Sequence, residues 1–371
     1  MINQGGMVTL LVMLLIGWSG PAYTQNPSPG AQPPAAMVKP SMVIKTQLFR
    51  SHERDGRTVE LIGRKGNDIF FRIPGVSQAA GQATININTI TKAVFEFQYD
   101  EFAVFPHVKK RRWADAAKVI IKAIAPTIPY LDLSTNNAVE PALEAAGYLF
   151  KSGTVLQQNG GATNEKAAAA AYAQAYNIFQ QVGAAQWFER ANNARLKAIQ
   201  CLVAMGKLET AADEFSKLQV CEEIGDSDYG LYWLVQADIL YQQKDYRAAI
   251  DAAVKSLVFN NKDMETFPDA LLLSANCYYA LQEMHQARDV YYEIVRLFEQ
   301  TDWSAMARKQ LVLMMKNNLT RGKERANYWK TLIDVKEDMN KLVEEYLKTT
   351  EISSVTNATT NAISQEGKTT P

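Results

Sequence analysis

The feature that most constrains the fold is an internal repeat of 38 residues in the second half of the chain. Three segments share one pattern: GKLETAADEF (206–215), KDYRAAIDAA (244–253) and QEMHQARDVY (282–291). In each, a turn position is followed two residues later by a large apolar residue, and three residues beyond that by an alanine. These alanines, Ala211, Ala249 and Ala287, are separated by 38 residues twice (249 − 211 and 287 − 249). Two equal intervals are hard to obtain by chance, so the pattern predicts a repeated structural unit.

Each unit is expected to be a pair of helices. From Trp113 onward the strand pattern disappears and apolar residues recur at helical spacing. The helices that precede the turns also match: Tyr232-Trp233-Leu234, Ala237 and Leu240 align with Leu271, Ala275 and Tyr278, and more loosely with Arg195, Ile199 and Leu202. A single unit cannot bury its own apolar face, so stacked neighbours are expected to share a continuous core.

This helix-turn-helix pattern resembles the tetratricopeptide repeat (TPR), whose unit is usually about 34 residues long. The resemblance is best over 230–260 and 268–299, fair over 192–220 and weaker elsewhere. The period is longer here, and the closing proline of the second helix is missing. The turn glycine is present only as Gly206, with Lys244 and Gln282 in its place. We therefore expect a divergent TPR-like array.

Flanking segments extend this array in both directions. Further helix pairs are expected at 137–151 with 164–182 and at 303–317 with 322–347. The array then covers 137–348, about five helix pairs in a right-handed superhelix. Before it, residues 100–136 form a connecting segment with half a repeat from Trp113 to the break Pro126-Thr-Ile-Pro129. Lys109–Arg112, the most basic run, is interpreted as a solvated linker, with an anionic partner site as the alternative.

Residues 43–99 are predicted to form a small five-stranded β-barrel. Short runs with period-2 alternation are separated by the turn signals Asp55-Gly56, Lys65-Gly66 and Pro74-Gly75. The strand count, turn positions and length resemble the small SH3-like or Sm-like barrels. The expected fold class is therefore multidomain: a small N-terminal β-barrel followed by an all-α TPR-like helical repeat solenoid.

The two ends of the chain do not read as folded domains. Met7 to Trp18 is an apolar run of 12 residues followed by small residues, which predicts a signal peptide over 1–24. A retained anchor stays open, since no Lys or Arg precedes the run. Residues 25–42 are a Pro/Ala-rich linker, and 349–371 are expected to be a disordered tail. We expect an exported protein, periplasmic or at the cell envelope if the host is bacterial, with no stable membrane span after cleavage.

No pattern in the chain indicates catalysis, a metal or a cofactor. The three histidines are isolated, and no paired cysteine motif, phosphate loop or nucleophile elbow is present. Cys201 and Cys277 occupy equivalent repeat positions too far apart for a disulfide, so free buried thiols are expected. Lys plus Arg and Asp plus Glu both total 39, and the barrel segment lacks the aromatic-plus-basic cluster of RNA readers, so no nucleic-acid partner is expected.

The TPR resemblance implies where a partner would bind. In that family the first helix of each pair lines a groove that holds a peptide or a partner helix. On this sequence the groove-facing candidates are Leu196, Gln200, Val203, Leu234, Asp238, Tyr241, Gln242, Leu272, Asn276 and Tyr279. Tyr241 and Tyr279 are equally compatible with packing between helices.

The resulting functional hypothesis is a non-catalytic, exported scaffold that binds a protein or peptide. The first alternative is a cell-wall or glycan-binding protein that uses the barrel, which exposed aromatics such as Phe70 or Phe71 would favour. The second is an enzyme with an unrecognised site, which a pocket with converging titratable groups would favour.

Overall fold

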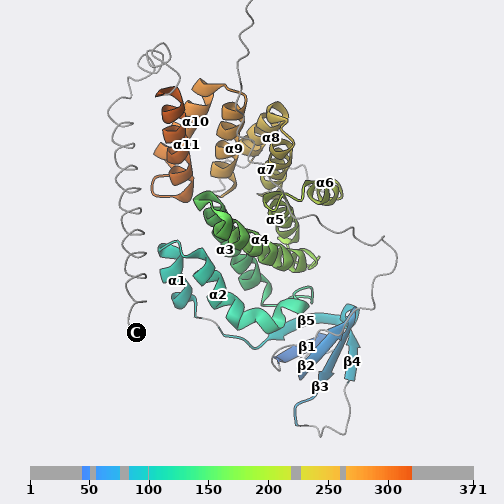
Figure 1. Ribbon diagram of the computed structural model, residues 1–371. Helices are drawn as coiled ribbons and strands as arrows, with labels where there is room; N and C mark the ends of the chain where they lie inside the picture. Colours follow the sequence, from blue (N-terminus) through green and yellow to red (C-terminus); the bar gives the residue numbers. More distant parts are fainter. Residues whose placement is uncertain are drawn as a thin grey trace, which may run out of the picture.

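The computed structural model describes residues 44–50, 56–75, 83–98, 100–218, 227–259 and 265–319. The predicted signal peptide, the linker 25–42, the helix 322–347 and the tail lie outside these ranges, as does Cys221. Within them an antiparallel sheet lies at one end of the molecule and eleven consecutively packed α-helices extend away from it (Figure 1). The coarse prediction of a small β unit followed by helices is confirmed.

The N-terminal sheet has five strands in the spatial order β4-β3-β2-β1-β5, each antiparallel to its neighbour. Their bounds are Ile44–Arg50 (β1), Arg57–Lys65 (β2), Asp68–Arg72 (β3), Ala83–Asn86 (β4) and Ile90–Phe95 (β5). A short 3₁₀ helix, Ile87–Thr89, joins the last two strands. Alternate residues such as Val59, Leu61 and Ile69 are buried on one face, as the period-2 pattern predicts.

The sheet is attached to the helices by the segment that leads into α3. Tyr130 and Leu133 from this segment complete the sheet's apolar core. The Asn137 side chain accepts from the Phe95 amide at 2.8 Å and donates to the Phe95 carbonyl at 3.0 Å, so it pairs with the free edge of β5 as a strand would. The two parts therefore share a core and a hydrogen-bonded edge.

A largely buried ion pair reinforces this junction. The Arg64 guanidinium donates to both carboxylate oxygens of Asp132, at 2.5 and 2.7 Å, and to the Pro129 carbonyl at 2.9 Å. Both side chains are less than a fifth exposed, 17% and 16%. A bidentate pair with this burial is more strongly coupled than a surface ion pair.

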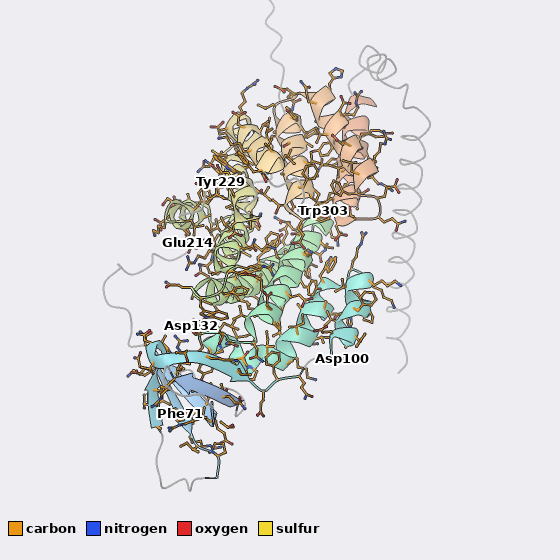
Figure 2. The ribbon with its side chains drawn as sticks, turned by 180° about the vertical axis from the view of Figure 1, so that it is seen from behind. Phe71, Asp100, Asp132, Glu214, Tyr229 and Trp303 are labelled. Carbon is orange, nitrogen blue, oxygen red and sulfur yellow. The ribbon has the colours of Figure 1, made fainter. Side chains whose placement is uncertain are left out.

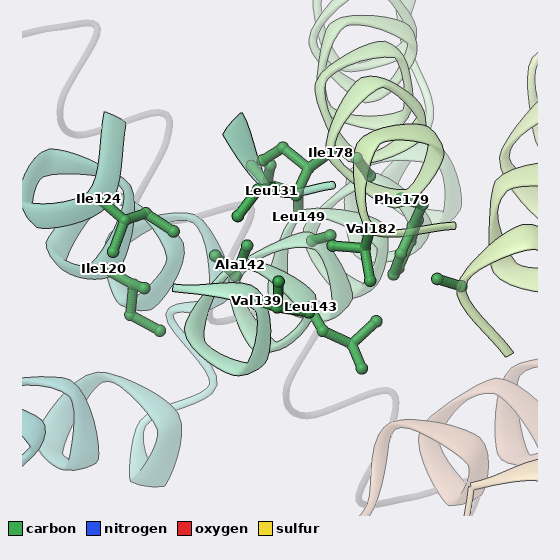
Figure 3. Close-up of a cluster of buried hydrophobic side chains, with 14 of the residues drawn as sticks. Ile120, Ile124, Leu131, Val139, Ala142, Leu143, Leu149, Ile178, Phe179 and Val182 are labelled. Atoms are coloured by element: carbon green, nitrogen blue, oxygen red, sulfur yellow. The ribbon is translucent and has the colours of Figure 1, made fainter. Parts of the chain in front are cut away.

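The helices from α3 onward overlap the predicted segments, although α3 extends to Asn159, beyond the predicted end at Lys151. Their bounds are Glu101–Lys109 (α1), Trp113–Ile124 (α2), Val139–Asn159 (α3), Ala162–Gly183 (α4), Ala191–Ala204 (α5), Leu208–Ser216 (α6), Ser227–Gln242 (α7), Tyr246–Phe259 (α8), Thr266–Ala280 (α9), Met284–Leu297 (α10) and Asp302–Leu319 (α11). The proline-containing break is a 3₁₀ helix, Ala125–Tyr130. Apolar side chains from α2, α3 and α4 form a continuous core (Figure 3). Cys201 and Cys277 are free and buried, as expected.

The three repeat turns share one backbone conformation. Gly206, Lys244 and Gln282 all have positive φ, at 73°, 67° and 64°. In each turn this residue's amide donates to the carbonyl three residues back, and the next amide donates to the carbonyl five residues back. This is the Schellman arrangement that ends a helix in the left-handed region. The turn therefore has the same geometry with or without glycine. In the two units with Lys244 and Gln282, a non-glycine residue adopts the left-handed conformation, which is energetically unfavourable.

None of the helices in the described part of the chain is both long and apolar enough to cross a bilayer.

We expect the loss of Arg64 to weaken the junction far more than the loss of an exposed pair. Arg64→Ala leaves the Asp132 carboxylate without its guanidinium, which should lower the free energy of unfolding by about 2 kcal/mol. The matched control is Arg72→Ala, because Arg72 pairs with Glu60 in the same sheet but is 43% exposed. That variant should change stability by about 0.5 kcal/mol or less. Urea unfolding checks both, and equal effects would contradict the assignment.

Restoring glycine at the repeat turns should stabilise the protein. Lys244→Gly and Gln282→Gly each remove a side chain from a left-handed position, which should raise the free energy of unfolding by about 1 kcal/mol each. Lys207→Gly is the control, because Lys207 follows a turn with an ordinary φ of −87° and should gain nothing. Thermal melts compare the three variants, and an equal gain for the control would overturn the explanation.

Candidate functional site

One side of the helical array encloses a cavity of about 260 Å³. Its walls come from the first helix of each pair, α3, α5, α7, α9 and α11, together with the start of α2. We call this space the inner cavity. Second helices of the pairs contribute none of its lining residues in the described part of the chain.

The inner cavity is closed where the last described helix meets the first ones. The Asp302 carboxylate at the start of α11 accepts from Arg111 Nη1 at 2.8 Å and from Trp113 Nε1 at 3.3 Å. Farther along α11, Lys309 Nζ donates to the Gln158 carbonyl of α3 at 2.7 Å. Figure 2 shows Trp303 at the junction between α11 and the end of α3. Residues about 190 positions apart thus meet at the cavity mouth.

Two lysines share one carboxylate on the cavity wall. Lys151 of α3 and Lys197 of α5 donate to the two oxygens of Glu265, at 2.8 and 3.2 Å. Burial alone would raise the pKa of Glu265, but the two ammonium groups outweigh it and lower that pKa to about 2. Glu265 is therefore an ionised carboxylate at any physiological pH.

Two other carboxyl groups, those of Asp238 and Asp269, have raised rather than lowered pKa values. Burial raises the pKa of Asp238 to about 7, against the hydrogen bond that Gln200 Nε2 donates to it at 3.2 Å. Burial likewise raises the pKa of Asp269 to about 6, against the hydrogen bond from Trp303 Nε1. Asp269 also raises the pKa of Asp238 through charge repulsion. Among the ion pairs of the described residues, neither group takes part in one.

Aromatic rings complete the wall. Trp113 stacks on Tyr148 with ring centroids 5.8 Å apart, and the Lys151 ammonium lies 5.4 Å from the Trp113 ring centroid. Trp303 packs against Phe298, and its indole N–H is directed to Asp269. The inner cavity thus combines flat apolar surfaces with charges of both signs, a combination suited to holding a charged side chain.

The predicted groove residues divide into three groups. Gln200 and Leu234 line the inner cavity, and Asp238 lies directly behind Gln200. Leu196 and Val203 are buried in the core, and Leu272 packs against the C-terminal core cluster. The remaining candidates lie farther along the array: Tyr241 packs on Tyr246, Asn276 accepts from the Tyr291 hydroxyl at 2.6 Å, Tyr279 packs against the C-terminal core cluster, and Gln242 is exposed.

Sequence reasoning missed most of the charged lining. Lys197 occupies the repeat position that holds Val235 in the next unit, and Asp269 occupies the position that holds Leu231. These charges therefore break the repeat, so a search for periodic residues passes over them. The one periodic signal was the polar series Gln200, Asp238 and Asn276, which are spaced by 38 residues.

The comparisons with known proteins bring no further assignment. No model of a protein family matches this chain, and no curated protein matches its sequence. Within the described ranges, no group of three or more His, Cys, Asp and Glu side chains is arranged to hold a metal ion.

We expect Asp238→Asn to stabilise the protein increasingly as pH rises. The pKa of Asp238 in the folded protein, about 7, is above the usual aspartate value of 3.8, so the free energy of unfolding falls as pH rises between these two values. Since one pKa unit corresponds to about 1.4 kcal/mol, the gain from Asp238→Asn should grow by about 2 kcal/mol from pH 5 to pH 7 and then level off. Exposed Asp251→Asn is the control. Urea unfolding at several pH values measures this, and a pH-independent difference would contradict the burial of Asp238.

Proposed function

We propose that this chain is an exported, non-catalytic scaffold that binds a peptide segment of another protein, with a basic side chain of that segment in the inner cavity. The observation that carries the proposal is the pair of Asp269, which lines the inner cavity, and Asp238, which lies behind Gln200 of its wall. Both carboxyl groups are buried, and no ion pair of the described residues neutralises either one. An ammonium or guanidinium group would favour their ionised forms and recover part of the cost of burial.

The size of the inner cavity supports a side chain rather than a whole cofactor. Ligand pockets for small molecules usually measure about 300–1,000 Å³, and this cavity of 260 Å³ is below that range. The Trp113 and Trp303 rings offer the flat surfaces over which a guanidinium or ammonium group is attracted. The Lys151 and Lys197 ammonium groups are already held by Glu265, so they oppose a cationic ligand less than free lysines would.

The family resemblances are part of this proposal. A TPR-like array would present the first helix of each pair to a partner, and the inner cavity is lined by those helices. An SH3-like or Sm-like barrel is compatible with the strand order and the 3₁₀ helix between β4 and β5. Export, to the periplasm or envelope if the host is bacterial, is supported by the sequence of residues 1–24 alone.

The glycan-binding alternative receives less support from the sheet. Phe71 is 8% exposed and belongs to the core of the sheet, and Phe70 is only partly exposed. One edge of the sheet, β5, is covered by the segment before α3. A flat aromatic platform for a sugar ring would require exposed rings on this unit.

An enzyme remains the second candidate because of one specific observation. Asp269, whose pKa is about 6, lines the cavity beside two lysines, and Asp238, whose pKa is about 7, lies behind Gln200 of the cavity wall. A cavity with carboxyl groups of raised pKa is a setting in which general acids and bases operate. The two functions differ in what happens to the bound peptide. A scaffold returns it with unchanged mass, whereas an enzyme returns products that mass spectrometry detects.

The binding proposal predicts a charge-selective, pH-dependent affinity. From a display library of random peptides, the mature chain should select sequences with Lys or Arg, and citrulline or norleucine in their place should abolish binding. Asp269→Asn should weaken binding at least about tenfold, because a buried charge pair is lost. Affinity should rise from pH 5 to pH 8 as the two carboxyl groups ionise.

The matched control for this experiment is Asp251→Asn, which removes an exposed carboxylate from α8 and should leave affinity unchanged. Circular dichroism must show that both variants are folded. Selection of acidic or purely apolar peptides, or equal affinity of Asp269→Asn and the unaltered chain, would refute the proposal.

A further inference from the structure

Helix α1 presents a large apolar surface to solvent. Phe102 is 88% exposed and Phe105 is 64% exposed, the two most exposed large aromatic residues among those described. They line an open groove of about 590 Å³ between α1 and α3, together with Val104, Val108 and Tyr148, and with Glu101 and Glu144 at its polar side. We call this surface the α1 patch. Two phenylalanines this exposed, three residues apart on one helix, are unusual for a surface with no partner.

Among the described residues, the helical array ends on a first helix, α11, that has no second helix after it. Each earlier first helix from α3 onward is followed by a second helix that packs against it, but α11 ends at Leu319, where the described residues end. The next repeat turn is due near residue 320, since the turns at 206, 244 and 282 are 38 residues apart. The sequence places Gly322 there and then predicts a helix over 322–347.

The sequence of 322–347 has an apolar stripe suited to docking. Its apolar residues recur at alternating intervals of four and three residues: Tyr328, Leu332, Val335, Met339, Leu342 and Tyr346. This is the spacing of a narrow seam that packs along other helices. The segment lies outside the described ranges. Its sequence pattern makes it a candidate, within the same chain, for covering the α1 patch.

Length directs the distal part of this segment to the α1 patch. At about 1.5 Å per residue, the 26 residues of 322–347 span ~39 Å, whereas the 18 residues of α11 span ~27 Å. A helix that returns antiparallel to α11 therefore passes the start of α11 by ~12 Å. At that point the Arg111–Asp302 pair places the end of α1 beside α11. The excess matches the ~13 Å length of the nine-residue α1.

Charge favours the same direction. The distal part, 334–347, carries five acidic residues and two lysines, a net charge of −3. The basic run Lys109–Arg112 follows α1 directly. An antiparallel arrangement places this acidic end next to the basic run, and a parallel one would place it at the opposite end of α11.

We propose that residues 322–347 form an amphipathic helix that packs along α11 and inserts its distal apolar stripe into the α1 patch. The helical array is then joined end to end, with the last helix covering the first. The basic run Lys109–Arg112 becomes the electrostatic partner of the chain's own acidic segment.

Disulfide trapping in the full chain tests the contact. In a background with Cys221→Ser, cysteines at Phe105 and Tyr346 should form an intramolecular disulfide under mild oxidation, seen as a faster-migrating monomer on a non-reducing gel. The control pairs Phe105→Cys with Glu344→Cys, because Glu344 lies on the opposite face of the predicted helix. That pair should react at least about tenfold more slowly.

Hydrogen exchange provides a second readout that needs no new covalent bond. The amides of 335–347 should exchange at least about tenfold faster in Phe102→Asp plus Phe105→Asp than in the unaltered chain, and Phe102→Leu plus Phe105→Leu should preserve protection. Disulfide-linked dimers would show that a second copy covers the patch. No disulfide together with unchanged exchange would show that residues 322–347 do not cover the patch. Either result overturns the proposal.

Discussion

The contact on which the inner cavity depends is the carboxylate of Asp302. It receives hydrogen bonds from Arg111 and Trp113, and so fixes the start of α11 against the start of α2. Without it, an array in which each helix contacts mainly its neighbours would leave the first helices on an open surface. With it, α3 and α11 enclose a space that no single repeat could form, because its walls come from five different units. The inner cavity therefore forms only where the last described helix, α11, contacts α2 and α3.

Three carboxyl groups at or behind the cavity wall differ both in their counter-ions and in their exposure, because the Glu265 side chain is 51% exposed and Asp269 and Asp238 are less exposed. Burial raises the pKa of all three, Glu265, Asp269 and Asp238. Only Glu265 has two ammonium groups in direct contact, and its pKa falls to about 2. Asp269 and Asp238 accept hydrogen bonds from neutral donors, an indole and an amide, which stabilise a carboxylate less than a cation in direct contact does. Lys151 and Lys197 also lower the pKa of Asp269, but neither forms an ion pair with it. Because of this difference, Asp269 and Asp238 are the groups whose ionised forms a cationic ligand would stabilise.

The sequence was sufficient for the helix pairs because alanines at a fixed interval mark close helix contacts, as Ala211, Ala249 and Ala287 do, all fully buried. It also located the turns, since the Schellman geometry persists at Lys244 and Gln282 without glycine. It did not locate the cavity, because Lys197 and Asp269 replace the valine and leucine of an equivalent unit. Contacts between residues about 190 positions apart, such as Arg111 with Asp302, leave no local pattern to read.

The sheet contributes to the same site through the start of α3. Asn136 donates to the Tyr130 carbonyl and accepts from the Ala138 amide, so the chain enters α3 in a fixed direction. Arg64 and the β5 edge hold this entrance from the sheet side. Lys151 lies 12 residues into α3, or ~18 Å along the helix axis, at the cavity wall. The sheet therefore holds the start of the same helix whose later turns carry Lys151 at the cavity wall.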